Sequence, residues 1–252
     1  MRFTLRNILL ITVAVMSLFS CGSKKNFVYV QGIEHAASYD ESKHYELTLQ
    51  PDDVLSIVVS AEDPEVTAPF NIPEIESNDK ESPGIKTYLI DNSGYIDYPV
   101  LGKLKLAGLS RSEASNLLVS GLSKYIHDPS INLRIMNFKV AVLGEVGRPN
   151  IYPIQHERIT LLEALSMAGD VGVYGLRQNI LIIRESEGKK TYTRVDITKP
   201  DFLNSPYYYL AQNDVVYVEP NKVRINSSVI GPNTAVFLSA VSLLATFIVL
   251  LR

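Results

Sequence analysis

Two long apolar segments, one at each end of the chain, confine the folded body to the residues between them. The first runs over residues 8–18 and follows a basic start at Arg2 and Arg6. The second runs from Ala235 to Leu251 and contains no charged residue. Charged residues return between these segments, so the chain has to build its hydrophobic core there.

The N-terminal segment has the organisation of a secretory signal, with basic residues, an apolar stretch and then small residues up to Ser20. The apolar stretch is too short to cross about 30 Å of hydrocarbon. Cys21 follows it and is the only cysteine, so it cannot close a disulfide within the chain. We expect residues 1–20 to be removed and Cys21 to carry a covalent attachment. The alternative is a free, buried cysteine.

The C-terminal segment predicts a membrane-spanning helix over residues 233–252, preceded by a linker over 220–232. As a helix, its apolar part reaches about 26 Å, close to the hydrocarbon thickness of a bilayer. Asn233 and Thr234 are expected to cap its start, and Arg252 closes its end. A helix in a soluble core would normally show a wide polar face, and this one has none.

Four small or hydroxyl residues share one side of this helix, because they are spaced four, three and four residues apart. A stripe of this kind is typical of close packing between membrane helices. The alternative is a pore-lining stripe, in which a ring of such helices turns its hydroxyls toward water. The stripe consists of Ala235, Ser239, Ser242 and Thr246.

The region between the ends is predicted to be α+β. Strands are expected within Tyr45 to Ser60, after the turn at 51–53, and again within Tyr209 to Pro220, where an aspartate turn also precedes a β-rich run. A hairpin is expected from strands 86–91 and 95–100. Further strands are expected at 131–135 and 139–143.

Two helices are expected, each starting with a capping box, in which a hydroxyl and a carboxylate satisfy backbone N–H groups. Ser110 with Glu113 starts one, and Thr160 with Glu163 starts the other, which Gly169 is expected to end. These elements form two small α+β units joined near residue 138.

Composition and spacing argue against several classes of function. The net charge of −3 does not favour binding to nucleic acid. The histidines are isolated and show no metal-ligand spacing. Asp52 and Asp53 are expected in a solvated turn, and the run Tyr207 to Tyr209 in a strand start rather than in a sugar-stacking site. We therefore expect no enzyme, no metal site and no cofactor apart from lipid on Cys21. The four histidines are His35, His44, His127 and His156.

Several of these motifs resemble those of a known family. Leu18 to Cys21 is similar to a bacterial lipobox. LQPDDVLSI, DNSGYIDYPVLGKLKLAGLSRSEA and HDPSINLRI, within residues 45–137, resemble a polysaccharide export domain. VAVLGEVGRPNIYPI, ITLLEALSMAGDVG and LAQNDVVYVEP, within 138–219, resemble a soluble-ligand-binding β-grasp (SLBB) domain. The chain thus resembles the outer-membrane polysaccharide export (OPX) lipoproteins of the Wza type.

The resemblance implies an organisation and a function. Residues 1–20 would be a lipoprotein signal peptide, and residues 21–44 a lipidated tether. Gly22 stands where an aspartate would act as an inner-membrane retention signal, so the outer membrane is expected, with the bulk of the chain in the periplasm. Asp52, Asn150 and Asp170 replace glycines that are common in the family, and we expect them to adopt the left-handed backbone of the corresponding turns.

The implied function is an oligomeric outer-membrane channel that exports capsular or exopolysaccharide. The implied partners are other copies in a homo-oligomeric ring, outer-membrane lipid, the polysaccharide itself and an inner-membrane polysaccharide co-polymerase, often a tyrosine kinase. The alternative is a non-conducting envelope scaffold or a ligand-binding lipoprotein that uses its β-grasp domain.

The assignment of Cys21 leads to a direct test. We expect Cys21→Ala to abolish incorporation of labelled palmitate and to mislocalise the chain, because several acyl chains are needed for stable anchoring. Labelling of the wild-type chain and fractionation of both proteins provide the measurement. Palmitate entering the Cys21→Ala variant would refute the attachment site.

Overall fold

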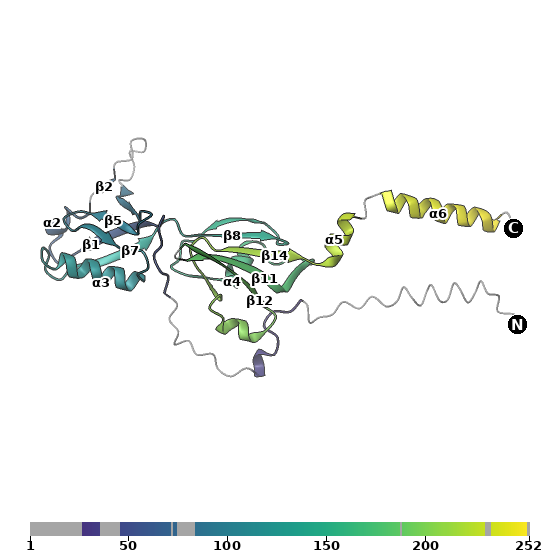
Figure 1. The fold of residues 1–252 in the computed structure, drawn as a ribbon, viewed down its shortest axis with the longest axis horizontal. Coiled ribbons are helices and arrows are strands. Elements are labelled where there is room, and N and C mark those ends of the chain that lie inside the picture. The colour runs from purple at the N-terminus through teal and green to yellow at the C-terminus, as the bar shows by residue number, and fades with distance from the viewer. Residues whose placement is uncertain are drawn as a thin grey trace.

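The computed structural model describes residues 27–35, 46–71, 73–74, 84–186, 188–229 and 233–250. The signal peptide, Cys21 and most of the predicted tether lie outside these ranges. Two α+β domains follow one another, and a helical segment leaves the second domain at the opposite end from the first (Figure 1). Each domain has its own cluster of buried apolar side chains.

The first domain is built on a three-stranded antiparallel sheet with the order β4-β1-β7. Helix α3 packs against β7. In the central strand β1, alternate residues such as Leu55 and Ile57 are fully buried, because one face of the sheet covers the core. The elements are β1 (Val54–Ser60), α2 (Pro64–Thr67), β2 (Pro73–Glu74), β3 (Gly84–Ile85), β4 (Thr87–Leu89), β5 (Tyr95–Tyr98), β6 (Gly102–Lys105), α3 (Arg111–Leu122) and β7 (Ser130–Ile135).

The predicted hairpin of strands 86–91 and 95–100 is wrong in its pairing. Strand β4 pairs with β1, whereas β5 pairs with the next strand, β6. The predicted turn does form, since the amide of Gly94 donates to the carbonyl of Asp91 at 2.8 Å. The alternation in the sequence located the strands, but the partner of each strand was decided by which neighbour buries its apolar face.

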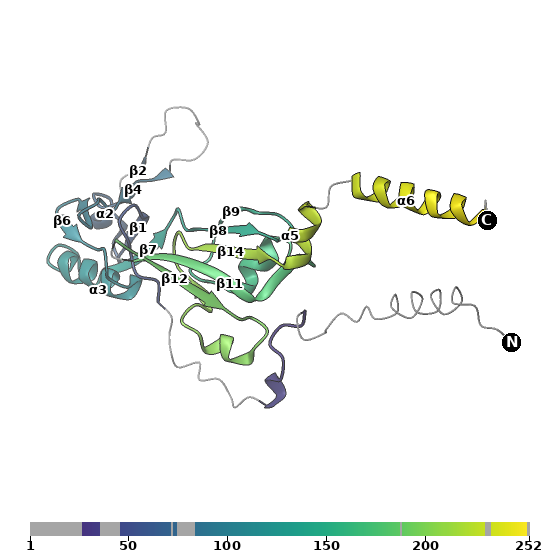
Figure 2. The same ribbon diagram turned by 45° about the vertical axis from the view of Figure 1, so that its right-hand side comes forward.

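The second domain is built on a five-stranded sheet with the order β12-β11-β14-β8-β9 (Figure 2). All its pairs are antiparallel except β14 with β8, which places the last strand beside the first. Helix α4 and the small pair β10 and β13 complete the domain. The elements are β8 (Lys139–Gly144), β9 (Asn150–Pro153), β10 (Ile159–Thr160), α4 (Leu161–Met167), β11 (Gly175–Ser186), β12 (Lys189–Val195), η3 (Pro200–Asn204), β13 (Tyr209–Leu210) and β14 (Val215–Pro220).

Both predicted capping boxes are confirmed. Ser110 accepts from the amide of Glu113, and the Glu113 carboxylate accepts from the amide of Ser110. Thr160 and Glu163 make the same reciprocal contacts at the start of α4. Gly169 follows the end of α4 with φ +76°, as a left-handed stop requires.

A left-handed backbone was expected at three residues, and it is found at two of them. Asp52 (φ 69°) and Asp170 (φ 67°) adopt the left-handed backbone that was expected for them. Asn150 does not, because it begins strand β9 and pairs with Val142. The turn expected at Asn150 therefore lies before it.

The C-terminal region consists of helices α5 (Lys222–Val229) and α6 (Asn233–Leu250). The predicted helix is thus confirmed as a helix, and α6 lies beyond α5, apart from the sheets (Figures 1 and 2). Within the described ranges, however, no helix combines the length and the apolar character that crossing a membrane requires. The prediction that residues 233–252 span the membrane is therefore not supported.

Gly144 offers a test of how tightly the second domain is packed. It has φ +90°, and an added Cβ would lie 2.1 Å from the carbonyl oxygen of Val218. Gly108 has a similar φ of +87°, but nothing lies within 4 Å of its Cβ position. We expect Gly144→Ala to lower the free energy of unfolding by at least about 4 kcal/mol.

Gly108→Ala serves as the matched control and should cost only about 1 to 2 kcal/mol of backbone strain. Urea unfolding of both variants measures the difference. Equal losses in the two variants would show that the close approach of β8 to β14 does not constrain the fold.

Candidate functional site

An aspartate turn precedes the central strand of each domain, and the two turns have the same geometry. In the first domain the amide of Gln50 donates to Asp53 Oδ2 at 2.8 Å. In the second domain the amide of Ala211 donates to Asp214 Oδ2 at 2.8 Å. Both aspartates are fully buried. The repeat seen in the sequence is therefore a structural repeat, although Asp53 was wrongly expected in a solvated turn.

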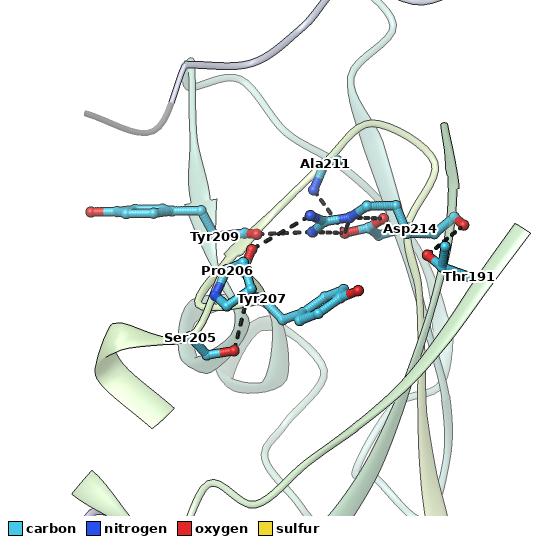
Figure 3. A network of polar contacts seen from close by, with 8 residues as sticks. Thr191, Ser205, Pro206, Tyr207, Tyr209, Ala211 and Asp214 are labelled. Carbon is cyan, nitrogen blue, oxygen red and sulfur yellow. Dashed lines mark hydrogen bonds and ion pairs between the residues drawn. The ribbon is translucent and has the colours of Figure 1, made fainter. Parts of the chain in front are cut away.

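In the second domain a cation compensates the buried carboxylate. Arg184 Nη2 lies 2.7 Å from Asp214 Oδ2, and its Nη2 also donates to the carbonyl of Tyr209 at 3.0 Å. Tyr207 covers the guanidinium, with its ring centroid 4.9 Å away. Burial raises the pKa of the Asp214 carboxyl, and Arg184 opposes that rise. The ion pair thus fixes the segment around Tyr207. The Tyr209 side chain points away from the ion pair (Figure 3).

In the first domain the equivalent carboxylate has no counter-charge among the described residues. Asp53 Oδ1 is buried without a hydrogen-bond partner. Burial raises the pKa of Asp53 to about 6, while the hydrogen bond from the Gln50 amide and the nearby Gln212 side chain oppose the rise. Because Gln212 belongs to the second domain, the Asp53 carboxyl lies at the junction between the domains.

Two amide side chains hold this junction together. Asn137 accepts from the amide of Val54 at 3.0 Å and donates to the carbonyl of Asp52 at 2.9 Å. Gln212 donates to the carbonyl of Asn137 at 2.9 Å and accepts from the amide of Lys139 at 2.8 Å. Each amide uses both its donor and its acceptor, so the domains are joined by a connected polar network.

The described start of the chain is bound to the second domain. The amide of Val30 donates to the carbonyl of Ile197 at 3.0 Å, and the amide of Gln31 donates to the carbonyl of Thr198 at 2.8 Å. Tyr29 packs against the domain's buried core. This part of the predicted tether therefore contacts the folded body, which the sequence did not indicate.

Arg177 is the main contact for this segment. It is only 7% exposed, and its Nη2 donates to the carbonyl of Val171 at 2.7 Å. Its guanidinium lies 5.3 Å from the ring centroid of Phe27 and 5.6 Å from that of Tyr29. The Tyr29 hydroxyl donates to Asp170, and burial raises its pKa to about 12.

Helix α5 is held by the same part of the domain. The amide of Asn221 donates to the carbonyl of Tyr174 at 2.7 Å. Arg224 lies over the Tyr174 ring at 5.7 Å and pairs with Glu145 at 3.5 Å. The segment at residues 27–31 and the segment that leads to α6 are thus both attached to residues 170–177, which comprise the connection before β11 and the start of that strand.

A cavity of about 760 Å³ opens in the second domain beside β10, α4 and Tyr209. It combines apolar side chains with hydrogen-bonding groups and one exposed cation, Arg158, whose guanidinium lies 5.2 Å from the Tyr209 ring centroid. Tyr209 begins β13, as its predicted place at a strand start requires. The lining residues are Pro153, Ile154, Gln155, His156, Arg158, Ile159, Thr160, Glu163, Ser166, Met167 and Tyr209.

The residues singled out in the sequence are not brought together into one site. Cys21 lies outside the described residues, and the Ala235 side chain is not described. Ser239, Ser242 and Thr246 are exposed on α6, where the Thr246 hydroxyl donates to the carbonyl of Ser242 at 2.8 Å. In the part of the chain that the structure describes, no group of acidic, histidine or cysteine side chains is arranged to hold a metal ion.

Comparison with known proteins assigns both domains. The family model described as "Polysaccharide biosynthesis/export protein" matches residues 41–136, and that of the SLBB domain matches residues 138–218. Asn137, in the polar junction, lies between the two matches.

Two curated relatives carry the name EPS I polysaccharide export outer membrane protein EpsA. That of Ralstonia solanacearum is 28% identical over 194 residues, which cover 72% of this chain and 51% of the relative. That of Ralstonia nicotianae is 29% identical over 194 residues, which cover 72% and 50%. The chain therefore spans about half the length of these relatives.

The buried carboxyl at the junction predicts a pH dependence of stability. The pKa of Asp53 is raised from 3.8 to about 6, so the folded chain binds this proton more tightly than the unfolded chain does. Its contribution therefore favours folding at low pH and is lost as the pH rises through this window. We expect Asp53→Asn, which does not titrate, to gain roughly 2 kcal/mol relative to wild type between pH 4 and pH 7.

Urea unfolding of both proteins at several pH values gives the measurement. Asp97→Asn removes an exposed carboxylate of the same domain and provides the control. Parallel pH profiles for wild type and Asp53→Asn would contradict the assignment.

Proposed function

We propose, on the premise that this chain belongs to the polysaccharide biosynthesis/export protein family and carries an SLBB domain, that it exports a capsular or extracellular polysaccharide across the outer membrane. The names of both Ralstonia relatives describe outer-membrane proteins for export of EPS I polysaccharide, which supports this location and role. The two α+β domains lie in the periplasm in this proposal.

The conducting form is proposed to be a closed oligomer. The cavity of about 760 Å³ lies on the surface of one domain and has the size of a small-ligand site, so it offers no passage through a single chain. A path for a polymer has to lie between subunits. Closed cyclic symmetry is the common way in which identical subunits enclose such a path.

Attachment to the membrane is proposed to occur at the second domain. Phe27 lies six residues after Cys21, so the chain between them spans at most about 20 Å. Because Arg177 holds Phe27, lipid on Cys21 would tether this domain near the membrane, with the polysaccharide export domain on the far side. The stripe of Ala235, Ser239, Ser242 and Thr246 is assigned to contacts between α6 helices of neighbouring subunits.

No catalysis is assigned to the chain. Its substrate is the polysaccharide, and its proposed inner-membrane partner is a polysaccharide co-polymerase, which in similar systems often has tyrosine kinase activity. That partner and polymer synthesis supply the work of export. The cavity of the second domain also favours a second candidate, a non-conducting scaffold or ligand-binding lipoprotein.

Stoichiometry separates the two candidates. For an export conduit we expect the full chain, solubilised in detergent, to appear as closed rings in electron micrographs. Ser242→Leu should break the rings and remove polysaccharide from the cell surface, because a larger side chain keeps packed helices apart. Staining of surface polysaccharide gives the second measurement.

Val241→Leu adds a methylene group elsewhere on the same helix, at a position that is 47% exposed, and is the matched control. It should keep both rings and surface polysaccharide. Two results together would favour the scaffold. The purified wild-type chain would remain monomeric or dimeric, and cells that lack the chain would keep their surface polysaccharide.

A further inference from the structure

We propose that the cavity of the second domain binds a short glycan segment that carries a carboxylate. This inference rests on the proposed export of polysaccharide and assigns a contact for that substrate. The cavity lies between β10, α4 and Tyr209, and its lining includes none of residues 170–177, which contact the terminal segments.

The size and the apolar part of the cavity suit a sugar. Its volume of about 760 Å³ lies within the range of small-ligand sites, about 300 to 1,000 Å³. Ile154 and Ile159 are buried beneath it, and the more exposed Met167 and Tyr209 line it. These side chains provide an apolar surface for the C–H groups of a sugar ring.

Several polar groups of the cavity are not engaged elsewhere in the described structure. The side chains of Gln155, His156 and Ser166 line it, and none of the described residues forms a hydrogen bond with them. Together they offer both donors and acceptors, which the hydroxyl groups of a sugar require. A ligand without hydroxyl groups would leave these polar groups unpaired at a cost.

Arg158 supplies the charge that selects an acidic sugar. Its guanidinium stacks on the Tyr209 ring and has no ion pair among the described carboxylates. The nearby Glu163 carboxylate forms no ion pair with Arg158, and its Oε2 accepts from the amide of Thr160 at 2.7 Å and from the Thr160 hydroxyl at 2.9 Å. A guanidinium held in this way can form two parallel hydrogen bonds with a ligand carboxylate.

The walls of the cavity are fixed before any ligand binds. Thr160 caps α4 and also pairs with Tyr209 across strands β10 and β13. Arg184, itself paired with buried Asp214, donates to the carbonyl of Tyr209 from the other side. Little conformational entropy is therefore lost on binding, which favours a weak but specific contact with a passing polymer.

Saturation-transfer difference NMR on the full chain in detergent tests the proposal, with trigalacturonate as the acidic probe and maltotriose as the neutral one. We expect transfer to trigalacturonate and little to maltotriose. Arg158→Ala should weaken binding of trigalacturonate at least about tenfold, as loss of a charged hydrogen bond does. Ser166→Phe, which fills the cavity from an exposed helix position, should abolish it.

Arg134→Ala is the matched control, because it removes an exposed arginine of the first domain. It should bind trigalacturonate like wild type. Absence of transfer from the wild-type chain to trigalacturonate would overturn the proposal. So would transfer in Arg158→Ala and Ser166→Phe equal to that of wild type. Equal binding of maltotriose would overturn the role of Arg158.

The two proposals fail in distinguishable ways. If deletion of the chain removes surface polysaccharide but trigalacturonate does not bind, the glycan site is wrong and the export function stands. If trigalacturonate binds at the cavity but surface polysaccharide does not depend on the chain, the site stands and the export function is wrong.

Discussion

A buried aspartate at the start of the central strand organises each domain. The carboxylate accepts a hydrogen bond from the backbone amide three residues earlier. This contact is made by Asp53 in the first domain and by Asp214 in the second. Burying a carboxylate is costly unless it is paired or protonated, and the domains meet this cost differently. Asp214 pairs with Arg184, whereas Asp53 has its pKa raised to about 6 and lies beside Gln212 of the other domain. The same local motif thus forms an ion pair with Arg184 in the second domain. In the first domain it places a carboxyl with a raised pKa at the domain junction.

The two domains act as a connected body because polar and apolar contacts cross between them. The Asn137 side chain bonds to backbone groups of Asp52 and Val54, and the Gln212 side chain donates to the backbone carbonyl of Asn137. Leu47, from the segment before β1, packs in the core of the second domain, and Ile135 touches both cores. These contacts link the cores of the two domains within one chain.

The second domain binds residues 27–31 and helix α5, and it also contains the cavity beside Tyr209. Residues 170–177 contact Phe27 and Tyr29 through Arg177 of β11, and they contact α5 through Tyr174. The cavity lies elsewhere on the same domain, where the Arg184 network and the cap of α4 hold its walls. The proposed membrane attachment and the proposed glycan contact therefore use separate surfaces of one domain.

The sequence by itself determined the features that depend on neighbours a few residues away. Both capping boxes and the strands of alternating burial follow from local chemistry, whereas the left-handed turns at Asp52 and Asp170 were expected from the resemblance to the family. Only the tertiary structure decided the pairing of β4 with β1, the burial of Asp53 and the binding of residues 27–31 to the second domain. The cavity beside Tyr209 likewise forms only in the tertiary structure. These features join segments far apart in the chain, and no local pattern states which distant surface a side chain will meet.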